Sequence, residues 1–407
     1  MPRPPPAAPS VPASTLLALG LAGFCAFLNV YATQPLLPLF REVFGISSGE
    51  AALTVSAPTV AVALASPFFG AIADRFGRRR VIVGSLFALS VPTLLAATSS
   101  GIGALVAWRF AQGLAVPGIY AVGIAYISEA CGGAALARGM AALVTGNVVG
   151  GFCGRAVSGF VGEHAGWRAV FVALGLLTAI GALATSRFLP RQPPPSGAPR
   201  ALRPLEAIRR LGPRLATPRL LATYAVGFNV LFVQVAMFTY ATFHLAAPPF
   251  RLGAAALSSI FLVYLVGAVI TPFAGRWIDR VGSRRALAVV LATAVAGGGL
   301  TLLPALWAVA LGLALCCTAV FVSQSASTAF LQSAAEPEAR STAAGIYVSS
   351  YYLGGAAGGI LPAAAWHLGG WTACVALVAL VQLGTIALAF RYWGAPKEAP
   401  SPAPAAV

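Results

Sequence analysis

The stretch Gly70-Ala71-Ile72-Ala73-Asp74-Arg75-Phe76-Gly77-Arg78-Arg79-Arg80 decides the fold of this chain. It concentrates five charged residues in a sequence whose charged fraction is only 9%. A second copy follows at an offset of 205 positions (279 minus 74), as Gly275-Arg276-Trp277-Ile278-Asp279-Arg280-Val281-Gly282-Ser283-Arg284-Arg285. The chain contains two aspartates, Asp74 and Asp279, and both occupy the same position in this repeat. The repeat predicts two homologous halves, each with a charged turn between hydrophobic helices.

Composition identifies the solvent around these helices. Apolar residues make up 58% of the 407 positions and charged residues 9%. A soluble protein cannot cover its surface with so few charged residues. Apolar runs of about 20 residues, the length that crosses a hydrocarbon core, follow one another with short breaks. Such runs are too long for barrel strands, so the sequence predicts an all-α polytopic membrane protein. We expect twelve spans, at 14–39, 50–73, 80–99, 101–127, 138–161, 168–189, 218–244, 253–277, 285–303, 305–331, 341–364 and 370–392.

The basic residues of the loops predict the orientation. With both termini in the cytoplasm, 21 of the 26 lysines and arginines lie on the inner side and three on the outer side. This asymmetry follows the positive-inside rule and explains the net charge of +16 without any nucleic acid. We therefore expect contact with anionic lipid headgroups at the cytoplasmic face. The expected organisation is a Pro-rich cytoplasmic N-terminus at 1–13, a six-helix half at 14–189, a cytoplasmic linker rich in Pro and Arg at 190–217, a second six-helix half at 218–392 and a disordered tail at 393–407.

The doubled loop motif resembles the major facilitator superfamily over residues 14–392. The signature of that family between its second and third spans reads G-x-x-x-D-R-x-G-R-R, and this chain matches it at Gly70, Asp74, Arg75, Gly77, Arg78 and Arg79. The second copy has Ser283 where the first has Arg78, and it keeps Gly275, Asp279, Arg280, Gly282 and Arg284. The resemblance implies a twelve-helix transporter of the bacterial inner membrane, with a substrate path between two pseudo-symmetric halves.

The resemblance also implies that the loop is a gate. Asp74 can meet the positive amino end of a neighbouring helix, which we expect to be the span at 341–364, and this contact would latch the cytoplasmic face in one state. Gly70 would permit close approach of helices. Glu129, at the cytoplasmic end of the fourth span, is implied to pair with the loop arginines, Arg78 above all. The alternatives are arginines that only contact lipid headgroups and a carboxylate that is only solvated.

Arg109 lies within a predicted span, in Trp108-Arg109-Phe110-Ala111-Gln112-Gly113. An arginine inside a bilayer costs several kcal/mol unless it is paired or faces water, so it is a candidate functional residue. Gln112 lies on nearly the same helix face and can share its hydrogen bonds. The spacing R-x-x-Q-G is similar to the fourth span of the drug/proton antiporter branches of the superfamily, which implies a role in proton coupling. A structural arginine that binds backbone carbonyls is the alternative.

A second arginine, Arg155, ends the glycine-rich stretch Gly146-Asn147-Val148-Val149-Gly150-Gly151-Phe152-Cys153-Gly154-Arg155. Closely spaced glycines let helix backbones touch. The stretch resembles the fifth-span motif of the antiporter branches, although Gly151 replaces its proline and Arg155 its last glycine. None of the ten acidic residues falls at the centre of a predicted span, so the two buried cations lack a buried anion. An anionic substrate group would supply that charge, and proton binding would fall to a rim acid such as Glu42 or Glu163, or to a histidine.

Further polar side chains within the spans are candidates for lining a central cavity. Asn29 and Gln34 of the first span have counterparts 200 positions later (229 minus 29), at Asn229 and Gln234. Each of these side chains can instead form hydrogen bonds between helices. The full set of coupling or substrate candidates is Arg109, Gln112, Arg155, Asn29, Gln34, Asn147, Asn229, Gln234, Gln324 and Tyr351.

These features predict a transporter, and neither a catalytic centre nor a metal site. A phosphate-binding loop G-x-x-x-x-G-K-[ST] is impossible because Lys397 is the single lysine. We expect no cofactor, a small-molecule substrate and a monomer. The first hypothesis is proton-coupled efflux of a small organic molecule by alternating access about a site near Arg109, Asn29 and Asn229. The alternatives are proton symport or facilitated uptake of an organic anion, and a membrane sensor that transports nothing.

Overall fold

The computed structural model describes residues 12–130, 133–191 and 211–394, and the regular structure in these ranges is helical. Most of the predicted N-terminus, linker and tail lies outside the described residues. The first half comprises α1 (Ala13–Val30), the 3-10 helix η1 (Gln34–Leu36), α2 (Leu37–Phe44), α3 (Ser48–Phe76), α4 (Arg78–Ala96), α5 (Ile102–Ala130) and α6 (Gly133–Phe188). The second half comprises α8 (Pro218–Ala246), α9 (Ala254–Ile260), α10 (Val263–Val281), α11 (Ser283–Leu300), α12 (Leu306–Ala334) and α13 (Arg340–Tyr392).

Two of these elements are too long for one membrane crossing. α6 has 56 residues and α13 has 53, whereas about 20 residues cross a hydrocarbon core. Each contains a glycine with positive φ, Gly166 at 79° and Gly370 at 59°, a conformation that glycine adopts at little cost. Each element therefore folds back as two helices, close to the predicted starts of the spans at 168–189 and 370–392.

The described ranges contain the predicted twelve crossings in two halves of six. Eight segments are long and apolar enough to cross a membrane, and α6 and α13 are two of them. α6 and α13 each cross twice. The remaining two crossings are α11 and the pair α9 and α10, which together form one crossing. The prediction of an all-α polytopic membrane protein is confirmed.

The bounds of two predicted spans were wrong. The first span was expected over 14–39, but α1 ends at Val30 and the chain continues through η1 and α2. Pro35 and Pro38 explain the break, because a proline has no N–H for an intrahelical bond. The span expected over 253–277 is interrupted between Ile260 and Val263, where no proline or glycine marks the chain.

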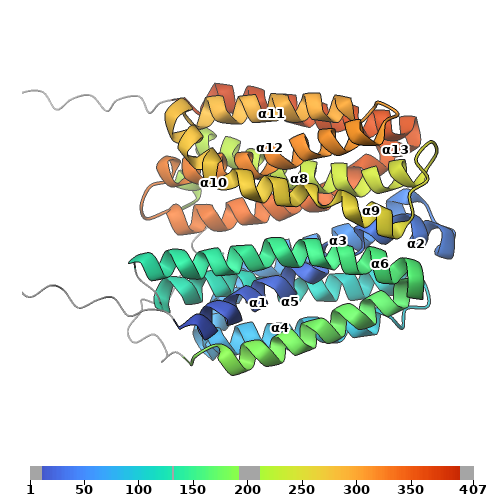
Figure 1. Cartoon of the computed structure of the whole chain (residues 1–407). Helices are drawn as coiled ribbons and strands as arrows, with labels where there is room; N and C mark the ends of the chain where they lie inside the picture. The colour runs from blue at the N-terminus through green and yellow to red at the C-terminus, as the bar shows by residue number, and fades with distance from the viewer. Residues whose placement is uncertain (1–11, 131–132, 192–210, 395–407) are drawn as a thin grey trace, which may run out of the picture.

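Figure 1 shows the two halves as two helical bundles side by side. Within the first half α1 packs on α6, and within the second α8 packs on α13. The backbones touch at glycines: a Cβ atom at Gly154 would collide with the carbonyl oxygen of Leu28, and one at Gly354 with that of Phe228. The close approach expected of the glycine-rich stretch is therefore present, and the second half repeats it.

The recorded contacts between the halves lie toward one end of the molecule. The turns at Gly77 and Gly282 define the arginine-rich end, and the other end is called the opposite end. α3 contacts α13 through its first turns, where Gly49 lies against Ala363 and Ser56 against Gly359. α6 contacts α9 at the opposite end as well (Figure 1). Residues 49–59 of α3 thus contribute to the contact between the halves, while Phe68 in its later turns is 64% exposed.

Candidate functional site

Both copies of the loop motif form the same turn. Gly77 joins α3 to α4 with φ at 86°, and Gly282 joins α10 to α11 with φ at 83°. The second glycine of the motif is therefore required by the backbone, because other residues are strained at positive φ. The first glycine of each copy, Gly70 or Gly275, is not required by the backbone in this way. No atom lies within 4 Å of a Cβ added at either, so the close approach expected of Gly70 is not made in this structure.

The first copy of the motif joins three helices at the arginine-rich end. Arg78 binds Glu129 at the end of α5 through Nε and Nη2, and its Nη2 lies 3.3 Å from Asp74 Oδ1. Arg79 donates from Nε to the carbonyl oxygen of Leu189 over 2.6 Å, after the end of α6. Arg75 lies over the ring of Phe76, 5.3 Å from its centre. The expected contact of Glu129 with Arg78 is present, and Asp74 interacts within its own half.

The second copy lacks this network. Ser283 replaces the arginine that binds Glu129 in the first copy, and no ion pair recorded between described residues includes Asp279. Arg284 lies over the ring of Phe390 at 5.4 Å, and Arg280 is exposed in the last turn of α10. A different pair occupies the arginine-rich end of this half, where Arg214 Nη1 lies 2.8 Å from Glu338 Oε2.

Arg109 is 1% exposed and joins α5 to α1 and α3. Its Nη1 donates to the carbonyl oxygen of Asn29 over 2.8 Å, and its Nη2 to that of Val30 over 2.5 Å. Its Nε donates to Thr54 O over 2.9 Å, and Gln112 Oε1 accepts from Nη1. The guanidinium therefore caps the carboxyl end of α1, where carbonyl groups lack intrahelical partners and the helix dipole favours a cation. These contacts explain how the cation is accommodated without a carboxylate.

Arg155 is 2% exposed and lies where the two halves meet. Its Nε donates to Gln34 Oε1 over 2.8 Å and its Nη1 to Gly151 O over 2.7 Å. The rings of Tyr31, Phe261 and Tyr264 surround the guanidinium, with ring centres 5.0, 4.8 and 4.6 Å from its carbon. Such contacts stabilise a cation, more so when it is desolvated. These residues, Arg155, Gln34, Tyr31, Phe261 and Tyr264, are called the Arg155 cluster.

The Arg155 cluster connects the two halves. Gln34 Nε2 donates to Thr239 Oγ1 of α8 over 3.2 Å, and Phe261 and Tyr264 belong to the second half. Tyr351 of α13 lies edge-on to Tyr352, with ring centres 5.3 Å apart, and Gln234 is half-buried on α8. No sequence pattern singles out Tyr31, Phe261 or Thr239, because their role depends on how the halves dock.

Arg109 and Asn29 lie together through the backbone carbonyl of Asn29, while the side-chain amides of Asn29 and Asn229 turn into their own halves. A substrate site near Arg109, Asn29 and Asn229 stays a prediction. The amide of Asn29 turns into the first half, where Nδ2 donates to Thr178 Oγ1 over 2.9 Å and Oδ1 accepts from Thr93 over 3.2 Å. The amide of Asn229 turns into the second half. Each asparagine amide thus faces other helices of its own half.

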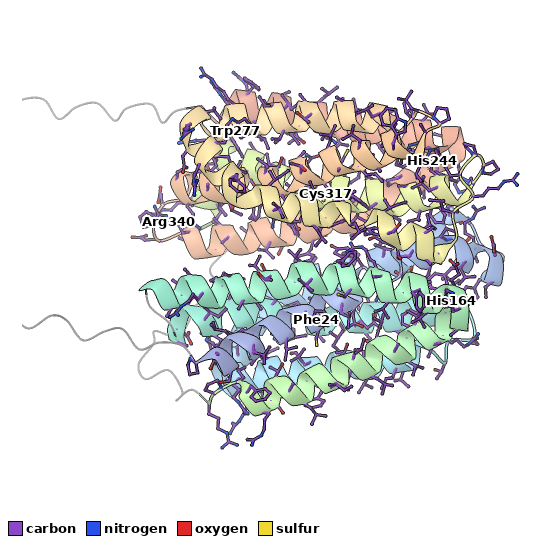
Figure 2. The ribbon with its side chains drawn as sticks, viewed as in Figure 1. Phe24, His164, His244, Trp277, Cys317 and Arg340 are labelled. Carbon is purple, nitrogen blue, oxygen red and sulfur yellow. The ribbon has the colours of Figure 1, made fainter. Side chains whose placement is uncertain are left out.

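The remaining candidates are spread over the molecule. Asn147 lies against Gly23 where α6 packs on α1, and Gln324 is half-buried on α12. Figure 2 shows His164 and His244 at the opposite end, far from Trp277 and Arg340 at the arginine-rich end. His244 stacks on Trp371, with ring centres 5.3 Å apart. Two of the histidines thus lie near helix ends, as predicted.

Comparison with known proteins identifies the family of the chain. The model of the Major Facilitator Superfamily matches residues 19–359 and, in a second match, 262–406. The inner membrane transport protein YnfM of Escherichia coli (strain K12) is 30% identical over 365 residues, which are 90% of this chain and 87% of that protein. The uncharacterized MFS-type transporter YybF of Bacillus subtilis (strain 168) is 29% identical over 363 residues, 89% of each chain.

A solved structure shares the fold. The bacterial homologue of the human lysosomal transporter Spinster, crystallised in an inward-facing and occupied conformation, superposes with a TM-score of 0.75. It is 17% identical, and the match covers 93% of this chain and 96% of that one. The family model, the relatives and the shared fold lead to one conclusion: this multi-pass membrane protein belongs to the major facilitator superfamily and is a membrane transporter of that type.

Proposed function

We propose that the protein is a secondary active transporter that expels a small organic molecule from the bacterial cytoplasm in exchange for protons, by alternating access. The observation that carries this proposal is the one-sided contact between the halves. By the positive-inside rule the arginine-rich end is cytoplasmic. The contacts at Gly49, Ser56 and Gln34 then close the outer side, which makes this arrangement inward-facing.

Each end has a group that can hold the halves together in one state. At the outer end Glu163 Oε2 of α6 accepts from the backbone N–H of Ala255 in α9 over 2.7 Å, a contact between halves. At the inner end Asp74 is 44% exposed and bonded only to Arg78 in the recorded contacts, so it remains accessible to the amino end of α13. Formation of the inner contact with loss of the outer one would convert the inward-facing state into the outward-facing state.

Proton coupling is assigned to the outer rim. Glu163 is a carboxylate that bridges the two halves, and its protonation removes the charge that favours the contact with α9. Arg109 is fully committed to α1, α3 and Gln112, so its part in coupling would be to hold α1 in place. Substrate would reach the Arg155 cluster, where aromatic rings from both halves meet.

Purified protein in liposomes with a trapped pH-sensitive dye tests this proposal. A panel of organic cations, neutral drugs and organic anions is added outside, and the dye reports proton movement. Exchange predicts that a cationic or neutral compound causes release of protons from the lumen, and that Asp74→Asn reduces this signal. A wild-type protein that moves no proton with any compound, while radiolabelled compounds still equilibrate across the membrane, would contradict proton coupling.

Uptake of an organic anion is the second candidate, and Arg155 favours it. No carboxylate is recorded in contact with this buried guanidinium among the described residues, and an anionic substrate would supply the missing charge. In the same liposomes a symporter predicts proton uptake into the lumen with anions alone. Arg155→Gln would then raise the half-saturating anion concentration, because the anion loses its counter-charge, whereas loss of a positive charge would not weaken the binding of a neutral or cationic compound.

A further inference from the structure

The second half encloses a small cavity lined by polar groups that lack partners. The cavity lies between α8, α11, α12 and α13 and has a water-accessible volume of about 10 Å³. Asn229, Ser323 and Gln382 line it and are 1%, 0% and 1% exposed. Neither amide atom of Asn229 has a hydrogen-bond partner, nor do Ser323 Oγ and Gln382 Oε1. Buried polar atoms in native proteins are nearly always paired, so this cluster requires an occupant.

The equivalent place in the first half shows how such a cluster is otherwise satisfied. Asn29 is the counterpart of Asn229, and its amide binds Thr93 of α4 and Thr178 of α6 directly. α11 follows the motif turn as α4 does, but it lines the cavity of the second half with Leu291 and Ala294, which have no hydroxyl group. The second half therefore keeps the asparagine and lacks one of its hydroxyl partners.

We propose that Asn229, Ser323 and Gln382 bind one water molecule inside the second half. The unpartnered set contains a donor, Asn229 Nδ2, together with the acceptors Oδ1 and Oε1 and a hydroxyl that can act either way. Water both donates and accepts, usually with about three bonds in buried sites. It therefore matches this mixed set, and the volume admits one molecule.

The surroundings exclude a metal cation as the occupant. No acidic residue lines the cavity, and Asn229 Nδ2 cannot coordinate a cation. A cation would therefore be desolvated without a counter-charge.

The bound water has a consequence for movement. Direct side-chain bonds hold α1 to α4 and α6, whereas α8 would be held to α12 and α13 through a molecule that can change partners. The second bundle can then adjust α8 without leaving polar groups unpaired. This inference does not depend on the transported substrate or on proton coupling.

Radiolytic labelling in heavy-oxygen water tests the proposal on the wild-type protein in lipid nanodiscs. A short X-ray pulse converts bound water into hydroxyl radicals, which label the side chains in contact with it. Cys316 lines the cavity and Cys25 lies near Asn29, and both are 1% exposed. We expect several-fold more heavy oxygen at Cys316 than at Cys25. Equal labelling of the two cysteines would overturn the proposal.

A variant without the polar groups provides the second measurement. The combination Asn229→Leu, Ser323→Ala and Gln382→Leu is close to volume-conserving and leaves no group to hold water. Its labelling at Cys316 should fall to the level of Cys25. The melting temperature of the wild type should be equal in sodium, lithium, potassium and choline chloride at one ionic strength. A melting temperature that rises with only one small cation, and does not rise in the variant, would indicate that this cation and not water occupies the cavity. That result would overturn the proposal.

Discussion

Arg109 and Asn29 are joined by a hydrogen bond of 2.8 Å, from Nη1 of the guanidinium to a backbone carbonyl oxygen one residue before α1 ends. The carbonyl oxygens of Val30 and Thr54 accept from the same side chain. A buried arginine thus stabilises the place where the first helix stops and the chain turns toward η1. Its first effect is on folding, and any effect on coupling follows from the position of α1.

Arg109→Ala should therefore destabilise the protein strongly. The carbonyl oxygen of Val30 loses its recorded partner, whereas those of Asn29 and Thr54 still accept from the N–H of Ala32 and the hydroxyl of Thr33. A buried unsatisfied group costs about 1–3 kcal/mol. Thermal unfolding in detergent, followed by tryptophan fluorescence, measures the loss. Arg168→Ala is the matched control, since Arg168 also donates to a backbone carbonyl, Ser99 O at 3.2 Å, but is exposed. A variant of Arg109 with normal melting and lost dependence on the proton gradient would instead assign the residue to coupling.

Asp74→Asn should reduce transport while the protein still inserts and folds. The expected reason is loss of the charge that binds the amino end of α13 in the outward-facing state, since the bond between Arg78 and Glu129 does not need Asp74. Asp279→Asn is the matched control at the same position of the second copy, where no ion pair is recorded in the described ranges. It should have the smaller effect on initial rates in liposomes. Equal losses in the two variants would contradict a latch specific to the first copy.

Gly154→Ala should destabilise the protein by forcing α1 away from α6. The added Cβ collides with the carbonyl oxygen of Leu28 in a buried contact. Gly84→Ala is the control, because nothing lies within 4 Å of its Cβ and the site is exposed on α4. Replacing this glycine should stabilise the helix by up to about 1 kcal/mol. Opposite shifts of the melting temperature are expected, and a Gly154 variant as stable as wild type would refute the close backbone contact.

The fold was predictable because its signals are local in sequence. The apolar runs, the repeated loop and the glycines before Trp167 and Trp371 each act within a few residues of the feature they produce. The interruption after Ile260 was not predictable, because no residue there disfavours a helix by itself. It lies where Phe261 packs on Arg155 of the other half, a contact made only after the halves dock.

The candidate site was only partly predictable. Arg109 stands out in sequence as a charge in an apolar run, but its acceptors are backbone carbonyl oxygens, which carry no sequence signature. Asn29 and Asn229 look alike in sequence, yet one is satisfied and the other is not. The difference depends on side chains of other helices, such as Thr93 and Thr178, that the repeat does not conserve.

Glu163→Gln should open the end of the molecule where α6 meets α9. The neutral amide oxygen accepts more weakly than a carboxylate from the N–H of Ala255, so a bond between the two halves is weakened. Spin labels at the exposed positions Ser100 and Leu303, at this end of the two halves, measure the opening. Glu42→Gln is the control, because Glu42 is also an exposed carboxylate at this end. It should leave the distance between the labels as in the wild type, and equal opening in the two variants would contradict a specific contact at Glu163.

Thr239→Val should shift the protein toward the outward-facing state without unfolding it. The change keeps the shape of the side chain and removes the hydroxyl that accepts from Gln34 Nε2 across the halves over 3.2 Å. A hydrogen bond of this kind contributes about 0.5–1.5 kcal/mol, so the ratio of outward-facing to inward-facing molecules should rise roughly 2- to 12-fold. Thr242→Val is the matched control, because Thr242 is also buried on α8 but its hydroxyl donates to Thr239 O within the same helix. The labels at Ser100 and Leu303 report both variants. Since Gln34 also orients Arg155, a shift with Thr239→Val alone would identify the Arg155 cluster as part of the outer gate, and equal shifts in both variants would assign the effect to α8 itself.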